Sequence, residues 1–272
     1  MKADAMMERR RRVVACLLLN VGALTLFTSQ TVLALQIPQD LKATVLSLLH
    51  ASDLDSRWRG VDRVIRVTAL QTDPDIHEAI VAELARVTEE RRQRFALMAR
   101  NAPVVSDDSG AEYRLLVGEA AIAIRDVRTL PHLITMAGTG GVVEDAIAAF
   151  GESATTSLLQ GWTLSRTDPT WKESSMQPGI VGAAHRMAAR GLVTSAAGRA
   201  RLTRICREAL DSPGHWSTLI SAIDLALSLN DQPLVDSVVA LRGGRPALAA
   251  RGITSPEDAD RVLKHLQTVI GR

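Results

Sequence analysis

Apolar side chains recur at helical spacing along almost the whole chain, and this periodicity constrains the fold more than any other feature. The positions Ile76, Ile80, Leu84 and Val87 follow one another at spacings of four, four and three residues. Such spacing places an apolar band on one face of an α-helix. No convincing run of alternating apolar and polar residues appears, and aromatic residues, which strands favour, make up only 3% of the chain. The sequence therefore predicts an all-α protein.

Capping residues, prolines and glycines divide this pattern into many short helices. Asp73-Pro74 and Ser255-Pro256 each place a capping side chain before a proline, which is tolerated at the first helical position. Many short antiparallel helices joined by tight turns are typical of an α-solenoid, in which helix pairs stack on one another. The expected helices span residues 39–51, 56–71, 74–100, 111–125, 129–137, 141–150, 152–164, 178–192, 196–211, 215–229, 231–242 and 256–270.

Two irregular segments interrupt the predicted helices. Residues 101–110 form a polar loop, in which Asp107 and Asp108 are expected to cap the helix that follows. Residues 165–179 form a longer loop that contains Pro169 and Pro178. A loop of this length is long for a connection between helices, and such loops are either functional or mobile.

A weak internal repeat accompanies the helical pattern. The segment Ala121–Asp126 reads Ala-Ile-Ala-Ile-Arg-Asp, and Ala226–Asp231 reads Ala-Leu-Ser-Leu-Asn-Asp. The two are 105 residues apart, and the apolar residues that follow each segment keep the same register. This offset corresponds to three units of about 35 residues, a length typical of helical repeat proteins.

The stretch 126–159 places a Leu-Pro in the first turn of one expected helix and ends the next helix at a Phe-Gly pair. The residues that carry this pattern are Asp126, Leu130-Pro131, Leu133, Val143, Asp145-Ala146, Ala148-Ala149-Phe150-Gly151, Ala154 and Leu158-Leu159. In these residues the stretch resembles a HEAT repeat of the bacterial kind also found in phycobilin-lyase-like proteins. The match is fair around 66–87 and 226–241 and fades over 165–215, where the repeat boundaries stay open. The resemblance implies a HEAT/armadillo-like solenoid, a curved stack of helix pairs that binds other proteins, and it brings no family-wide catalytic residues.

Residues 1–34 have the composition of an export signal. Four arginines, Arg9–Arg12, precede an apolar run over Val13–Phe27, and the tripeptide Val32-Leu33-Ala34 suits a signal peptidase that cleaves after Ala34. The mature domain would then be residues 35–272, in the periplasm or secreted. An uncleaved membrane anchor formed by residues 13–35 and a cytosolic protein with a misplaced start codon remain the alternatives.

The charge balance of the body excludes a large electrostatic surface for nucleic acid. The first 34 residues hold five of the 32 Lys/Arg and two of the 30 Asp/Glu, so the remainder carries a net charge near −1. The run Glu89–Arg94 is expected to be a solvated helix face with internal ion pairs, or alternatively a basic docking patch.

Cys206 is the only cysteine after the leader, so no intramolecular disulfide forms, and we expect a small buried side chain rather than a reactive thiol.

A search for catalytic patterns finds none. No glycine-rich phosphate loop with a following Lys-Ser/Thr is present, and the six histidines are scattered singly. The segment Gly151–Thr155 differs by one residue from a nucleophile elbow and lacks the strand that such an elbow requires. We therefore expect no catalytic residue, no cofactor and no metal ligand.

The best candidate for contact with a partner is Trp171, which Lys172 and Glu173 follow directly in the loop 165–179. Tryptophan often anchors interfaces, although Trp171 can instead fasten the loop to the helices. The expected function is an exported, non-catalytic scaffold or adaptor that binds a protein or peptide. The alternatives are a carrier of a lipid or glycan, which a long apolar groove would favour, and a lyase-type enzyme, which a deep pocket with shifted pKa values would favour.

Overall fold

Helices begin in the structure where the sequence places capping residues before prolines. In the computed structural model, Asp73 accepts hydrogen bonds from two backbone N–H groups in the first turn of α4 (Pro74–Ala99), at 2.9 and 3.2 Å. Ser255 accepts one in the first turn of α14 (Pro256–Ile270), at 3.4 Å. Both caps satisfy N–H groups that lack a partner within the helix.

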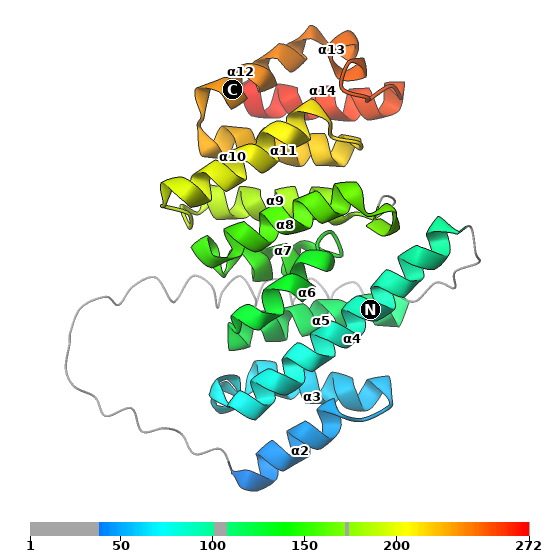
Figure 1. The fold of residues 1–272 in the computed structure, drawn as a ribbon, viewed down its shortest axis with the longest axis vertical. Coiled ribbons are helices and arrows are strands. Elements are labelled where there is room, and N and C mark those ends of the chain that lie inside the picture. The colour runs from blue at the N-terminus through cyan, green and yellow to red at the C-terminus, as the bar shows by residue number, and fades with distance from the viewer. Residues whose placement is uncertain (1–37, 101–107, 172–173, 272) are drawn as a thin grey trace, which may run out of the picture. The chain divides into compact units, whose positions relative to one another are not determined.

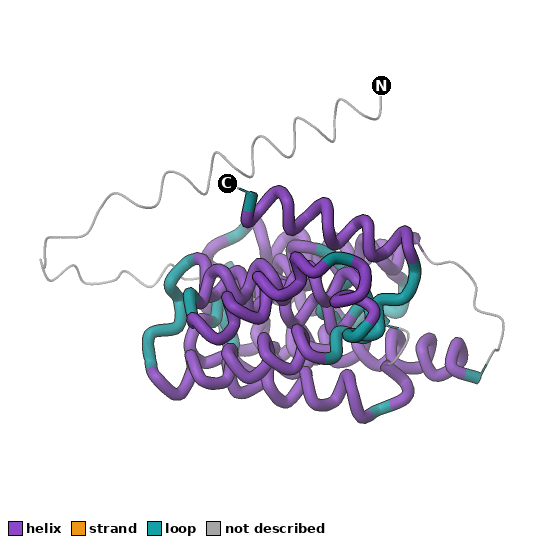
Figure 2. Tube along the Cα trace, turned by 90° about the horizontal axis from the view of Figure 1, so that it is seen from above, coloured by secondary structure: helices purple, strands orange, loops and turns teal. Residues whose placement is uncertain are grey.

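The structure describes residues 38–100, 108–171 and 174–271, which contain helices, turns and loops but no strand (Figure 2). Most of the helices fall into two rows. The first row is α2 (Gln39–Leu49), α4, α6 (Leu130–Thr135), α8 (Ala154–Thr167), α10 (Ala196–Asp211) and α12 (Gln232–Ala240). The second row is α3 (Leu54–Arg66), α5 (Asp108–Ile124), α7 (Gly141–Ala148), α9 (Met176–Ala189), α11 (Trp216–Leu229) and α14.

Each row is built from helices that alternate along the chain. In the first row α2 packs against α4, α4 against α6, α6 against α8, α8 against α10, and α10 against α12. In the second row the same holds from α3 through α5, α7, α9 and α11 to α14. Consecutive helices such as α2 and α3, or α10 and α11, pack as pairs across the rows, and Figure 1 shows these pairs following one another from α2 to the C-terminal helices.

The apolar bands of the helices form the core between the rows. The band on α4 is buried as expected, since Ile76, Ile80 and Leu84 are fully inaccessible and Val87 nearly so. Cys206 is also buried, which confirms the expectation of a small core side chain. The described residues therefore confirm an all-α fold.

In the segment expected to be a loop over residues 165–179, the described residues, 165–171 and 174–179, are largely helical. Helix α8 continues to Thr167, a 3₁₀ turn follows at Pro169–Trp171, and α9 begins at Met176. Pro178 lies in the first turn of α9, where its missing N–H has no helical partner to lose. Gly179 is also helical, and it is needed for close packing, because a Cβ there would lie 2.0 Å from the backbone nitrogen of Gly138.

Two further differences concern element boundaries. Helix α5 begins at Asp108, inside the loop expected over residues 101–110, of which 101–107 lie outside the described residues. The short helix α13 (Arg245–Ala249), which packs against α14, is not evident in the sequence, because five residues are too few to show a periodic band.

The described helices belong to one compact unit over Ile37–Arg272. None of them is both long and apolar enough to cross a bilayer. The predicted leader over residues 1–34 lies outside the described part of the chain, and so does the predicted cleavage point after Ala34.

Candidate functional site

The structure buries Trp171, the candidate for contact with a partner. Its side chain is only 2% accessible, and its ring packs on that of Phe95 in α4, with centroids 5.8 Å apart and planes inclined by 55°. Trp171 therefore fastens the 3₁₀ turn to α4, which is the competing interpretation of the sequence. Lys172 and Glu173, the other two candidate contacts, lie outside the described residues.

Phe95 connects this turn to a buried arginine. The guanidinium of Arg91 lies 5.3 Å from the centre of the Phe95 ring. Its Nη1 donates hydrogen bonds to the carbonyl of Thr135 and to Oγ1 of Thr139, both at 2.9 Å, and its Nη2 donates to the carbonyl of Ala137 at 3.4 Å. These carbonyls lie at and just beyond the end of α6, so Arg91 caps that helix end.

The described hydrogen-bond partners of Arg91 are neutral, although its side chain is buried, with 6% of the residue accessible. Neutral acceptors satisfy the N–H groups of the guanidinium. They offset only part of the hydration free energy that a cation loses when it is buried. Burial, followed by repulsion from Arg114, lowers the pKa of Arg91 to about 10. The group therefore stays charged at neutral pH and lacks a described counter-ion.

A cavity of about 240 Å³ opens beside Arg91, and we call it the arginine pocket. Its only carboxylate among the described lining residues is Glu90, which forms an ion pair with Arg86 one turn earlier in α4. The guanidinium groups of Arg91, Arg94 and Arg114 line this space together with that carboxylate. The lining residues are Glu90, Arg91, Arg94, Phe95, Arg114 and Thr139.

The arginine pocket corrects the expectation that Glu89–Arg94 is a wholly solvated face. Arg92 is exposed and pairs with Glu89 at 2.8 Å, as expected, but Arg91 is buried. A signal for this burial exists in the sequence, because Arg91 stands four residues after Val87 and so continues the apolar band of α4.

A second hollow, of about 300 Å³, lies along the second-row helices α7, α9 and α11. Its charged groups are paired across neighbouring helices: Arg186 contacts Glu144 and lies 3.3 Å from Asp145. The Nε2 of His265 lies 2.7 Å from a carboxylate oxygen of Asp224. These contacts tie successive helices together, and the hollow is polar. It is lined by Glu144, Gly182, His185, Arg186, Ser221 and Asp224.

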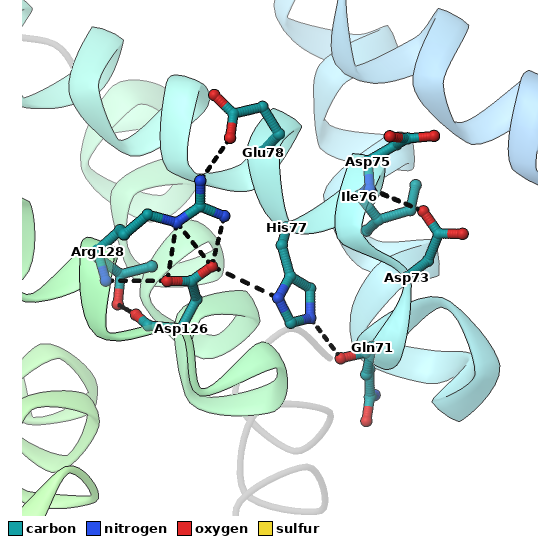
Figure 3. A network of polar contacts seen from close by, with 9 residues as sticks. Gln71, Asp73, Asp75, Ile76, His77, Glu78, Asp126 and Arg128 are labelled. Atoms are coloured by element: carbon teal, nitrogen blue, oxygen red, sulfur yellow. Dashed lines mark hydrogen bonds and ion pairs between the residues drawn. The ribbon is translucent and has the colours of Figure 1, made fainter.

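A third polar network lies between α4 and the turn that precedes α6 (Figure 3). Arg128 lies between two carboxylates, with nitrogen–oxygen distances of 2.7 Å to Asp126 and 2.6 Å to Glu78. His77 lies 3.5 Å from Asp126 through Nδ1 and 2.7 Å from the carbonyl of Gln71 through Nε2. The hydrogen bond from Arg128 is the main cause that holds the pKa of Asp126 below its ordinary value. The network thus links the start of α4 to the turn before α6.

Groups that could carry other chemistry are dispersed or buried. In the part of the chain that the structure describes, no three His, Cys, Asp or Glu side chains lie close enough together to hold a metal ion. Burial raises the pKa of the Cys206 thiol to about 12, so it is protonated and unreactive at neutral pH.

Comparisons with protein-family models, curated proteins and solved structures found no match to this chain.

Proposed function

We propose that this protein is an exported, non-catalytic scaffold or adaptor of the HEAT-like solenoid type, and that it binds another protein. The observation that carries the proposal is the arrangement of its helices in two rows, in which the helices from α2 to α12 pack against the helix two places along the chain. Stacked helix pairs of this kind present an extended surface, and such surfaces typically hold a protein or peptide.

The surfaces of the second-row helices favour a protein partner over a lipid. The hollow along α7, α9 and α11 is lined by carboxylates, a guanidinium, an imidazole and a hydroxyl. A lipid chain would gain little from such a surface, because hydrophobic stabilisation scales with the apolar area removed from water. A peptide, by contrast, can satisfy polar groups with its own backbone and side chains.

Export is part of the proposal and has its own test. Arg9–Arg12, the apolar run and Val32-Leu33-Ala34 predict cleavage after Ala34. N-terminal sequencing of the protein recovered from outside the cytoplasm should begin at Leu35. Full-length protein in the membrane fraction would instead support an anchor formed by residues 13–35, and full-length protein in the cytosol would contradict export.

Affinity capture tests the binding function. The exported protein, tagged at its C-terminus, is cross-linked in its own cells and recovered, and the bound molecules are identified by mass spectrometry. A tagged exported helical protein of unrelated sequence serves as the control bait. We expect one or a few proteins to be enriched over the control. Recovery of a lipid or glycan without any enriched protein would contradict the scaffold and favour the carrier.

A further inference from the structure

We propose that the hollow along α7, α9 and α11 binds the side-chain ammonium group of a lysine from the protein partner. This inference rests on the proposed function, since it names the chemistry of the partner. The groups that accept the three N–H bonds of the ammonium are the carboxylates of Glu144 and Asp224 and the Nε2 atom of His185. All three residues line the hollow.

The hydrogen bonds of Ser228 fix the tautomer of His185. The hydroxyl of Ser228 donates to the backbone carbonyl of Asp224 at 2.9 Å, and its oxygen lies 3.0 Å from Nδ1 of His185. A hydroxyl has a single proton to donate, so its oxygen accepts from the imidazole and Nδ1 carries the proton. In the neutral ring Nε2 is then an acceptor, and it has no hydrogen-bond partner among the described residues.

Asp224 supplies a second acceptor that is only partly used. One of its carboxylate oxygens accepts a hydrogen bond from Nε2 of His265 at 2.7 Å, and the other has no partner among the described residues. A neutral imidazole can donate this bond, so the contact requires no positive charge on His265. In the described part of the chain no Lys or Arg forms an ion pair with Asp224.

The balance of charge around the hollow favours a cation. Arg186 contacts Glu144 and lies 3.3 Å from Asp145, and Arg190 lies 2.6 Å from the same oxygen of Asp145. Together with Asp224, this group holds three carboxylates against two guanidinium groups. The side chains of Glu144 and Asp224 are only 17% and 28% exposed, so water screens their charges less than it does at an open surface.

The distribution of the acceptors favours an ammonium group over a guanidinium or a metal ion. The donors of a guanidinium lie in one plane and match the two oxygens of a single carboxylate. The N–H bonds of an ammonium diverge, and so they can reach acceptors on three helices. No three His, Cys, Asp or Glu side chains in the described residues lie close enough together to hold a metal ion. The bonds of a metal ion such as zinc are about 2 Å long, whereas the hydrogen bonds of an ammonium span about 2.8 Å.

Small residues provide the space for the lysine. A Cβ on Gly182 would lie 3.0 Å from Oε2 of Glu144, so any side chain at this position would crowd that carboxylate. Ser221 stands three residues before Asp224, so the two lie on one face of α11. The hollow between these positions has a volume of about 300 Å³.

Binding of defined peptides to the mature protein, residues 35–272, tests the inference. The probe is the peptide Gly-Ala-Lys-Ala-Gly, acetylated at its N-terminus and amidated at its C-terminus, so that the lysine carries its only charge. The matched control contains Nε-acetyllysine, which lacks the positive charge. In an NMR titration, the amide resonances of Gly182 and Ser221 should shift with the lysine peptide, with a Kd in the millimolar range, and should not shift with the control.

Two further peptides identify the source of the cation. One has arginine in place of the lysine, and the other has alanine at that position and a free N-terminus. Both should bind more weakly than the lysine peptide. Equal or tighter binding of either peptide would overturn the assignment to a lysine side chain.

Variants locate the binding site. Asp224→Asn should weaken binding of the lysine peptide by about tenfold, the effect of losing one charge-assisted hydrogen bond. His185→Phe keeps a ring but removes the acceptor, and it should also weaken binding. The matched control is Asp260→Asn, because Asp260 is exposed on α14 and pairs with Arg245 at 2.8 Å, outside the hollow. Melting temperatures show that each variant is folded.

Two results of these titrations would overturn the inference. The first is equal binding of the lysine and acetyllysine peptides, and the second is equal binding by the Asp224→Asn and Asp260→Asn variants. Partner capture separates the inference from the proposed function. Equal capture of the same partners by wild type and by Asp224→Asn would reject the hollow while the proposed function stands. If the lysine peptide binds but the wild-type bait captures no protein, the ammonium site stands and the proposed function fails.

Discussion

At the scale of single residues, the burial of Trp171 decides its role. Its ring is packed against Phe95 and is almost inaccessible to solvent. We expect Trp171→Ala to lower the free energy of unfolding by about 3–5 kcal/mol, because it removes a large buried side chain and leaves a cavity. Urea unfolding followed by circular dichroism measures the loss, and Leu164→Ala, at a more exposed position, is the control. Unchanged stability together with lost partner capture would mean that Trp171 is an interface anchor after all.

A second residue-scale prediction concerns Cys206. Its thiol is buried and donates to the carbonyl of Ala222 at 3.4 Å. Burial raises its pKa to about 12, so the thiolate that reacts with disulfide reagents is scarce at neutral pH. The folded mature protein should not react with Ellman's reagent within minutes, whereas the protein unfolded in guanidinium chloride should release one equivalent. Rapid reaction of the folded protein would show that Cys206 is accessible.

At the scale of elements, helix α9 approaches the turn that follows α6 so closely that one position excludes a methyl group. A Cβ on Gly179 would lie 2.0 Å from the backbone nitrogen of Gly138, and backbone cannot move aside as a flexible side chain can. Gly179→Ala should therefore destabilise the protein by about 2 kcal/mol or more. Gly118→Ala in α5 is the matched control, because its Cβ would meet Val143 at 3.4 Å, an ordinary contact. It should be neutral or stabilising by about 0.5–1 kcal/mol. Thermal unfolding of both variants compares them, and equal melting temperatures would rule out the close approach.

The stability that the contact between α4 and the turn before α6 contributes should depend on pH. The pKa of Asp126 is held below its ordinary value of 3.8, chiefly by the hydrogen bond from Arg128. A carboxyl group whose pKa is lower in the folded than in the unfolded protein stabilises the fold. This stabilisation is complete at pH values above the pKa of the unfolded state, and it is lost as the pH falls through the pKa of the folded state. Asp126→Asn should cost about 1–2 kcal/mol at pH 7. The difference between wild type and variant should shrink below about pH 3.8. A difference that stays constant from pH 7 to pH 2 would show that the charge of Asp126 contributes nothing.

At the scale of the whole molecule, each helix pair depends on its neighbours for a buried face. Ile147 of α7 is fully buried, and α7 packs against α5, α6 and α9. The substitution Ile147→Asp would bury an unpaired charge at this position. We expect it to lower the free energy of unfolding by about 3 kcal/mol or more. Val127→Asp is the control, because Val127 is 58% exposed, and it should change stability by less than about 0.5 kcal/mol. Chemical unfolding measures both, and similar midpoints for the two variants would place Ile147 outside the core.

The sequence by itself determined the local structure of this protein. The spacing of Ile76, Ile80 and Leu84 predicts an apolar helix face, and that face is buried. The caps Asp73 and Ser255 predict helix starts, and both accept hydrogen bonds in the first turn. These features depend on residues within a few positions of one another, so a single segment contains the information that specifies them.

The tertiary structure alone decided the roles of individual residues at the candidate site. Trp171 gains its contact from Phe95, Arg91 from the carbonyls that follow α6, and Gly179 from the backbone of Gly138. Each of these pairs joins segments far apart in the chain, and no local pattern specifies which helix will pack on which. Burial, the shift of a pKa and the opening of a pocket all depend on that packing, because they depend on which groups replace water around a side chain.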